Sequence, residues 1–369
     1  MGLSEACFAL HFIIRNAMPH SDSIKDPPLI FDPVLHLAFT PPKARYSFTE
    51  LGLAKPHNAP DTCYTEPFQL FSEECIRLMR RELFQKEFLD KWMRTWDRAP
   101  CYIGGFSADD CEDADFIKQA WYHPATQAAI NQAFGTALKP VRRHCDVGYV
   151  NVQLGPDGRD GVYKYTEFPS PPKTESEEKS LWDEVPIDAW HKDQVPVVCV
   201  MMLSDTSSMD GGETAVRLGN GKVVKARGAG LGGAVLMQSG TLEHAAMRAS
   251  NCAERLSMVT SFSFADPDLD DSRLTLKTAD YVNEDMAALR LAHLDYKLNR
   301  LRDRVELALH RANKARKERA EPDRGEIDAW VKEQILFLKQ MSWELFEREP
   351  NYVGKEVPDD VFRAYLSGD

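Results

Sequence analysis

The stretch that decides the fold is Trp190-His191-Lys192-Asp193-Gln194, taken together with His244 farther along the chain. On a β-strand, residues i and i+2 face the same side, so the side chains of His191 and Asp193 can reach one ion. His244 stands 51 positions after Asp193, beyond several predicted strands. In a closed barrel of two layers, that separation can return the second imidazole to the first pair.

Two imidazoles and one carboxylate on one face of a metal ion leave three coordination positions open, as in non-haem Fe(II) oxygenases. The open positions allow a cosubstrate and O2 to bind side by side. The sequence therefore predicts that His191, Asp193 and His244 are metal ligands and catalytic residues.

Arg255 and Ser257 repeat the two-residue spacing on the last predicted strand. A guanidinium binds a carboxylate through two parallel hydrogen bonds, and a hydroxyl adds one more donor. Arg255 follows His244 by eleven residues, which suits the far carboxylate of 2-oxoglutarate. The keto-acid end of that cosubstrate would then chelate the metal.

The segment from 195 to 264 is rich in strand patterns. Asn220-Gly221 predicts a tight hairpin turn, and Gly211-Gly212-Glu213-Thr214 opens a strand. The other strands are predicted at 195–203, 223–226, 234–238 and 256–264. Because no long helical pattern interrupts them, we expect a largely antiparallel sheet folded as a jelly-roll sandwich or barrel.

A further strand is predicted at 147–154, where Tyr149, Asn151 and Gln153 share one face. Any of the three could donate to the 1-carboxylate of 2-oxoglutarate, and Asn151 and Tyr149 are our candidates. The alternative is ordinary strand packing or a cross-strand hydrogen bond. Other side chains that could line the pocket are Trp190, Gln238 and Phe264.

Upstream of this strand, Ser72 can cap a helix that we expect to run to Trp92, and a second helix is predicted from Pro124 to Gly135. Residues 1–65 are predicted to be an irregular leader and wrap, 66–270 the β domain, and 271–369 a helical region. The loop at 155–180 is long enough to be either disordered or functional, and we favour an active-site cover.

The C-terminal region carries an apolar seam with alternating spacings of three and four, followed by a second amphipathic helix after a polar break at 318–325. One interpretation is an antiparallel helical hairpin packed on the barrel. The other is a homodimer contact. The seam consists of Leu291, Leu294, Leu298, Leu301, Val305, Ala308, Ala312 and Ala315, and the second helix carries Ile327, Val331, Ile335, Leu338 and Leu345.

The composition limits the classes of binding partner and the cell compartment that we expect for this protein. A formal charge of −12 argues against nucleic acid and against an anionic membrane surface, because the summed field repels both. Eight cysteines without CxxC spacing are typical of reduced cytosolic thiols. The apolar run at 6–14 is too short to span a bilayer. We therefore expect a cytoplasmic protein.

The order H-x-D, H and R-x-S, with Gly-Gly-Glu-Thr between, resembles the Fe(II)/2-oxoglutarate-dependent dioxygenase superfamily and its double-stranded β-helix. His191-Lys192-Asp193-Gln194, Leu203-Ser204-Asp205 and 255–262 are similar to fungal members, and the resemblance covers about residues 60 to 265. It implies Fe(II), 2-oxoglutarate and O2, decarboxylation to succinate, and abstraction of a substrate hydrogen.

Residue by residue, the resemblance implies His191, Asp193 and His244 as iron ligands and Arg255 with Ser257 as the 2-oxoglutarate clamp. Asp193 speaks against halogenation, since halogenating members have a small residue there.

We expect an oxygenase of fungal-type specialised metabolism that acts on a small molecule. Hydroxylation is the default outcome, and desaturation or ring closure, including C–N closure on an amino acid, is the alternative outcome. Rival functions are a protein or peptide hydroxylase or demethylase, a catalytically silent barrel that binds partners, and a cupin-like metalloenzyme without 2-oxoglutarate.

Overall fold

The structure is a computed structural model that describes residues 29–95, 101–107, 109, 111–143, 145–153, 186–207, 209–226, 230–250, 252, 254–269, 274–276, 282–345, 364 and 367. The leader before residue 29 and the 155–180 loop lie outside the described residues, so their roles stay predictions. Residues Phe31–Asp369 form one compact unit. The division into wrap, β domain and helical region also stays a prediction.

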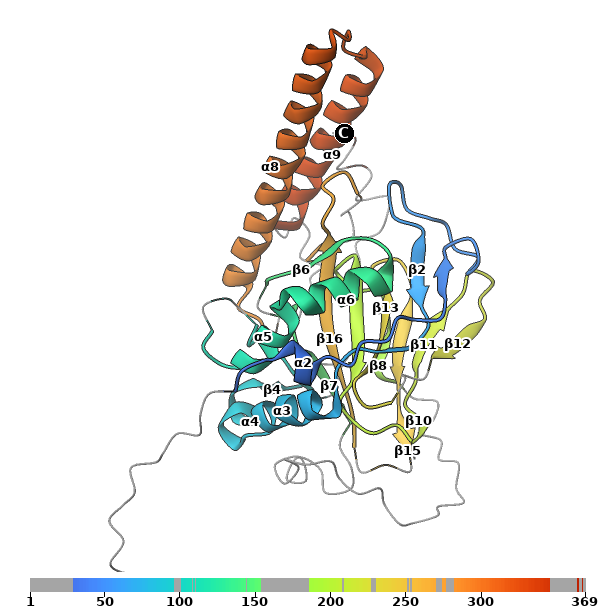
Figure 1. Cartoon of the computed structure of the whole chain (residues 1–369), viewed down its shortest axis with the longest axis vertical. Helices are drawn as coiled ribbons and strands as arrows, with labels where there is room; N and C mark the ends of the chain where they lie inside the picture. Colours follow the sequence, from blue (N-terminus) through green and yellow to red (C-terminus); the bar gives the residue numbers. More distant parts are fainter. Residues whose placement is uncertain are drawn as a thin grey trace, which may run out of the picture. The chain divides into compact units, whose positions relative to one another are not determined.

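The β core consists of antiparallel sheets (Figure 1), as the sequence predicts. The main sheet has the order β1-β2-β13-β9-β16-β7-β5-β4, with β3 beside β13 and β6 beside β16. Its strands are β1 Arg45–Ser47, β2 Thr62–Thr65, β3 Phe68–Gln69, β4 Met93–Arg94, β5 Tyr102–Ile103, β6 Leu138–Pro140, β7 Tyr149–Gln153, β9 Val197–Met202, β13 Gly233–Met237 and β16 Arg255–Phe264.

A second sheet has the order β12-β11-β14-β8, and a short pair joins β10 to β15. The hairpin between β11 and β12 closes at the predicted Asn220-Gly221 turn, where Leu218 N–H donates to the carbonyl of Lys222. These strands are β8 Pro186–His191, β10 Asp210–Gly211, β11 Thr214–Arg217, β12 Val223–Ala226, β14 His244–Met247 and β15 Ala249–Ser250.

Apolar side chains of both sheets meet in one buried cluster, which holds the sheets together. Val198 of β9, Val235 of β13 and Val216 of β11 belong to it, together with Leu242. Strand alternation explains the arrangement, because every second residue of these strands points to the same interior.

The N-terminal part of the chain contributes five short helices: α2 Pro33–His36, α3 Glu73–Leu83, α4 Lys86–Trp92, α5 Asp115–Tyr122 and α6 Pro124–Phe134. Ser72 caps α3 as predicted, and α6 begins at Pro124 and ends before Gly135. The single helix predicted from Ser72 to Trp92 is wrong. Phe84 leaves the helical conformation with its ring buried, and extended Gln85 starts α4 in a new direction.

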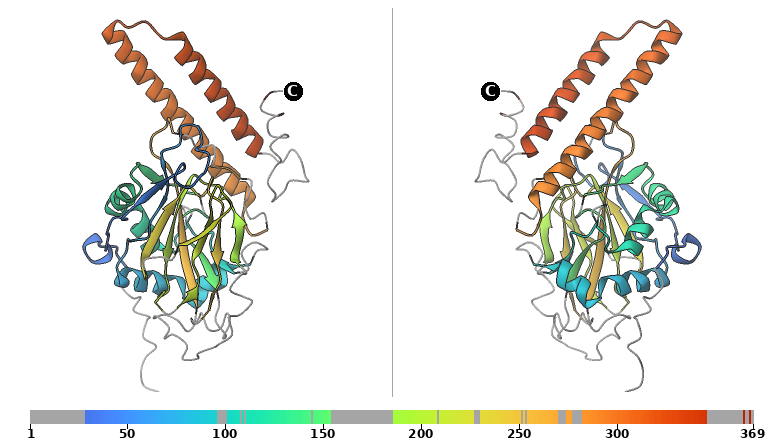
Figure 2. Two further views of the ribbon diagram at one scale, coloured as in Figure 1. Left: turned by 90° about the vertical axis from the view of Figure 1, so that its right-hand side faces the viewer. Right: turned by 90° about the vertical axis from the view of Figure 1, so that its left-hand side faces the viewer.

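The C-terminal helices α8 Met286–Glu318 and α9 Arg324–Leu345 form an antiparallel hairpin (Figure 2), as predicted. The predicted seam, however, does not face the barrel. Leu291 and Leu298 are 68% and 48% exposed, whereas His293, Lys297 and Arg300 are buried. Within the described residues, no helix is long and apolar enough to span a membrane.

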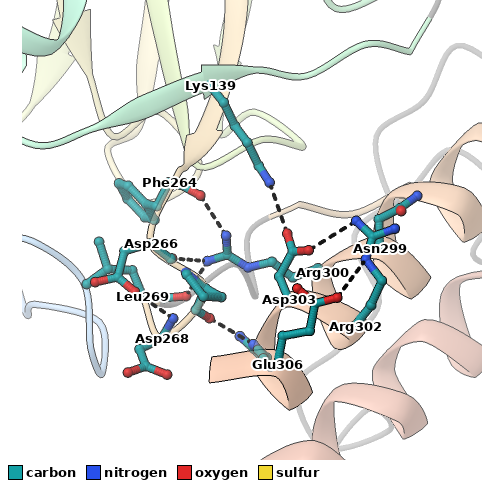
Figure 3. Close-up of polar contacts among 12 residues, drawn as sticks. Lys139, Phe264, Asp266, Asp268, Leu269, Asn299, Arg300, Arg302, Asp303 and Glu306 are labelled. Atoms are coloured by element: carbon teal, nitrogen blue, oxygen red, sulfur yellow. Dashed lines mark hydrogen bonds and ion pairs between the residues drawn. The ribbon is translucent and has the colours of Figure 1, made fainter. Parts of the chain in front are cut away.

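Arg300 explains why a polar face of α8 points inward (Figure 3). Its Nη1 donates to the carbonyl of Phe264 at 2.6 Å, and its Nη2 donates to those of Asp266 and Leu269 at 2.5 and 2.9 Å. The guanidinium thereby binds the chain that leaves the end of β16. Docking through carbonyls requires a donor-rich side chain, so the leucines occupy other faces of the helix.

Candidate metal centre

Two neighbouring strands and the turn after one of them position the three predicted ligands. His191 ends β8 and His244 begins β14, and the two residues are direct partners in the antiparallel register. Asp193 lies just after β8, where its N–H donates to the carbonyl of Ser239 at 3.0 Å. The structure thus brings together three residues that span 54 positions of the chain.

The ligand atoms are close enough to hold one ion. Nε2 of His191 lies 3.2 Å from Oδ1 of Asp193, and Nε2 of His244 lies 3.4 Å from Oδ2 of the same carboxylate. All three ligand atoms are within 4.8 Å of one another, and the described residues contain no second group of this kind. Two imidazoles and a carboxylate in this arrangement fit Fe(II).

Each imidazole is oriented by a backbone carbonyl. Nδ1 of His191 lies 2.6 Å from the carbonyl of Ala189, and Nδ1 of His244 lies 3.0 Å from that of Leu242. Because a carbonyl only accepts, each Nδ1 carries the proton in the neutral ring and Nε2 keeps its lone pair. Both rings therefore present the metal-binding nitrogen towards Asp193.

The electrostatics of the group favour an ionised carboxylate. Burial by itself would raise the pKa of Asp193, but the two imidazoles, His244 foremost, hold this pKa well below its ordinary value. Burial would lower the pKa of His244, and Asp193 raises it instead. The site thus stabilises positive charge against Asp193, which a divalent cation supplies in full.

Arg255 is fully buried on β16 and is only partly satisfied. Its Nε donates to the carbonyl of Gly212 at 3.0 Å, and its Nη1 donates to Oγ of Ser257 at 2.8 Å. Its Nη2 has no partner among the described residues. Burial lowers the pKa of Arg255 to about 10, so the group is still charged at neutral pH. An anion in the cavity would pair with this buried cation and accept from Nη2.

Two other fully buried arginines, Arg143 and Arg300, have partners at both terminal nitrogens, whereas Nη2 of Arg255 has none among the described residues. Arg80 pairs with Glu254, and Arg143 binds Asp146 through Nε at 2.5 Å and Nη2 at 3.1 Å. Arg300 donates to three carbonyls. Among the described residues, Arg255 forms no ion pair, although Glu213 and Asp188 influence its pKa from a distance.

The metal group and Arg255 line the same cavity between the two sheets. Asn151 and Ser257 are register partners, and so are Tyr149 and Val259. Asn151 is buried, and its Oδ1, which can only accept, has no partner among the described residues. Its Nδ2 is the atom that could donate to a carboxylate. The ring of Tyr149 stacks on Tyr102 at 4.9 Å. The cavity walls also include Val198, Val200, Val259, Thr214, Ala246 and Ser261.

Three side chains proposed from the sequence as pocket liners do not line this cavity. Trp190 packs on the outer face against Ala215, Ala245 and Met247. Gln238 donates to the carbonyls of Pro60 and Thr62, and Phe264 is buried near the docking point of α8. Strand polarity alone predicted them wrongly, because alternation does not say how far along a strand the cavity extends. The structure also ties Gln153 to Ala249, where it bridges two strands.

Sequence reasoning missed Asp188, a buried carboxylate that lines the cavity. Its Oδ1 lies 3.6 Å from Nδ1 of His191. The register pairs Asp188 with Ala246 and His191 with His244, so β8 has one extra residue over this interval. This bulge turns two residues three apart to the same side. Period-two spacing gives no signal for such a pair.

No family model matches the chain, and no curated protein matches its sequence. Similar solved structures include a 2OG-Fe(II) oxygenase family oxidoreductase from Burkholderia pseudomallei, at 13% identity and TM-score 0.33, covering 52% of this chain and 78% of that one. The non-heme alpha ketoglutarate dependent epimerase SnoN from nogalamycin biosynthesis has 12% identity, TM-score 0.33 and coverages of 53% and 75%.

A prolyl-4-hydroxylase from Pseudomonas putida has 15% identity and TM-score 0.33, with coverages of 55% and 92%. The geometry of the site itself, with its three ligand atoms and the buried Arg255, indicates the function.

Proposed function

We propose that this chain is an Fe(II)- and 2-oxoglutarate-dependent oxygenase built on a double-stranded β-helix. One observation carries the proposal: a fully buried arginine, whose Nη2 has no partner among the described residues, lines the same cavity as two imidazoles and a carboxylate. The three ligand atoms of that group lie within 4.8 Å of one another. The metal-ligand group and the guanidinium together fit a dicarboxylate that would chelate the metal at one end and bind the guanidinium at the other.

His191, Asp193 and His244 would hold the metal, and their backbone contacts orient the ligand side chains. When bound, Fe(II) and 2-oxoglutarate supply, with O2, the oxidant that removes a hydrogen atom from the substrate. The carbonyls of Ala189 and Leu242 keep each Nε2 available. Asp193 is held in place through its own N–H, so no large movement is needed to assemble the ligands.

Arg255 would bind the far carboxylate of 2-oxoglutarate through Nη2. Ser257 accepts from Nη1, so its own hydroxyl proton would be left to donate to the same carboxylate. Asn151 and Tyr149 would donate hydrogen bonds to the 1-carboxylate at the keto-acid end of 2-oxoglutarate. Val198, Val200 and Val259 give the cavity apolar walls, and a low dielectric there would strengthen the ion pair.

The substrate is a small molecule. The side chains of His191, Asp193 and His244 are only 9%, 18% and 8% exposed, so a folded protein surface has little access to the ligands. We assign the enzyme to fungal-type specialised metabolism in the cytoplasm, where the free thiols of the described cysteines stay reduced. Hydroxylation is the default reaction, with desaturation or ring closure as the other outcome of the same hydrogen abstraction.

Anaerobic titration of the protein with Fe(II) and 2-oxoglutarate tests the proposal. The chelate gives a visible charge-transfer band, which we expect in the native protein and not in His191→Ala. Arg217→Ala is the matched control, because Arg217 lies outside the cavity over the ring of Trp190. Absence of the band in the native protein, at Fe(II) and 2-oxoglutarate concentrations in the millimolar range, would falsify the assignment.

A further inference from the structure

The hairpin of α8 and α9 exposes most of the large apolar side chains that the described residues leave in solvent. Nine of fifteen such side chains lie on these two helices. By contrast, α9 buries only Gln334 and Phe337, and α8 buries four polar side chains beside Leu289. A solvated helical hairpin normally has the opposite distribution.

On α8 the exposed apolar residues form one stripe. Leu291, Leu298 and Val305 are seven residues apart, and Leu309 follows four residues later. At 3.6 residues per turn, these positions lie within about 40° of one another. The buried residues Lys297, Arg300 and Arg304 occupy the opposite side. A stripe with a seven-residue period fits another helix.

A matching stripe runs along α9, where Ile327, Val331, Ile335 and Leu338 are all between 39% and 50% exposed. The charges of the two helices are complementary. From 286 to 318 there are nine lysines and arginines against four acidic residues, whereas 324 to 345 has three against four. Pairing α8 with α8 would repel, and pairing α8 with α9 does not.

We propose that the chain forms a two-fold symmetric homodimer in which α8 of each copy packs along α9 of the other. With both hairpin tips at the same end, the basic end of α8 around Arg316 and Lys317 lies beside Glu326 and Asp328 of the second copy. Val305 and Leu309 then meet the stripe of α9. A second copy of the chain presents an α9 stripe to α8 and an α8 stripe to α9. Two-fold symmetry therefore creates two equivalent contacts between the copies.

Light scattering on the full chain at several concentrations measures the mass. We expect about twice 41.8 kDa for the native chain and 41.8 kDa for Leu298→Glu/Val305→Glu. The double variant should raise the dimer dissociation constant at least about 100-fold. Val223→Glu, at another exposed apolar position, is the matched control and should stay dimeric. A monomeric native chain, or a double variant that stays dimeric, overturns the proposal.

A mixing experiment tests the pairing without touching any apolar contact. Variant one carries Arg316→Glu and Lys317→Glu, and variant two carries Glu326→Lys and Asp328→Lys. Each variant alone should be monomeric, because like charges then meet across both contacts. An equimolar mixture should form heterodimers, because opposite charges then meet across both contacts. If the substitutions acted only through repulsion inside each hairpin, mixing would not restore the dimer. Two variants that dimerise alone as well as the native chain exclude the α8–α9 pairing.

Discussion

The β core and the C-terminal hairpin use charged and apolar side chains in opposite ways. In the core, apolar side chains form the interior, and Arg255 is a buried cation whose Nη2 has no partner among the described residues. In the hairpin, Arg300 and Lys297 are buried while Leu291 and Leu298 are exposed. The core therefore leaves a buried donor at a cavity, whereas the hairpin leaves apolar side chains in solvent, which we propose that a second copy of the chain covers.

The largest effect should follow loss of a metal ligand in the core. We expect His244→Ala to reduce turnover by about 10⁴-fold or more, because the remaining two ligands do not hold the metal in an open three-position site. Metal content and succinate formation are the measurements. His293→Ala is the control, since that histidine is buried in the hairpin. An equal loss of turnover in His244→Ala and His293→Ala would show that the metal-ligand candidates in the core do not differ from a buried histidine of the hairpin.

Removal of the clamp should have the next largest effect. Arg255→Ala should weaken 2-oxoglutarate binding by about 100-fold or more, since truncating one partner of a buried charge pair costs about 2–5 kcal/mol. The dissociation constant under anaerobic conditions is the readout, with Fe(II) affinity measured alongside. A cupin-like enzyme without 2-oxoglutarate would instead keep its turnover in this variant.

Arg300 provides the corresponding test in the hairpin. Arg300→Met keeps the length of the side chain but leaves three carbonyls without their donor. We expect the free energy of unfolding to fall by about 2–3 kcal/mol. Chemical denaturation measures this, and hydrogen exchange should locate the change at 264–269. Binding of 2-oxoglutarate should stay native, and a loss of it would show that the two regions are coupled.

Asn151→Ala is expected to act more mildly on the core. One hydrogen bond to the cosubstrate is removed, so we expect affinity for 2-oxoglutarate to fall about tenfold. Gln153→Ala, two residues along the same strand, removes a bridge to Ala249 instead. It should lower stability without this change in affinity. The opposite result would assign the cosubstrate contact to Gln153.

The smallest effect concerns pH and the hairpin. Burial lowers the pKa of His293 below its ordinary value of 6.5 although Glu344 lies 3.4 Å away, with Lys297 and Arg143 opposing protonation. Below pH 6.5, His293 binds a proton in the unfolded chain before it does so in the folded chain. The free energy of unfolding therefore falls as the pH drops below 6.5. His293→Leu should flatten this part of the pH profile measured by denaturation.

Two-residue spacing and the family resemblance together predicted that the metal-ligand candidates and Arg255 with Ser257 lie close together, although Asp193 lies in the turn after β8 and not on a strand. A strand repeats every two residues, so His191 with Asp193 and Arg255 with Ser257 were each predicted to share a face. The structure places both pairs and His244 at one cavity. The turn at Asn220-Gly221 and the hairpin of α8 and α9 were likewise predictable, because their signals are local in the chain.

Only the tertiary structure decided which way the less constrained residues face. Asp188 reaches the cavity through a bulge, Trp190 turns to the outer face, and the seam of α8 points away from the barrel. The physical reason is the same in each case. A sequence pattern specifies that residues share a face, but neighbours distant in the chain, such as the carbonyls that bind Arg300, determine where that face points.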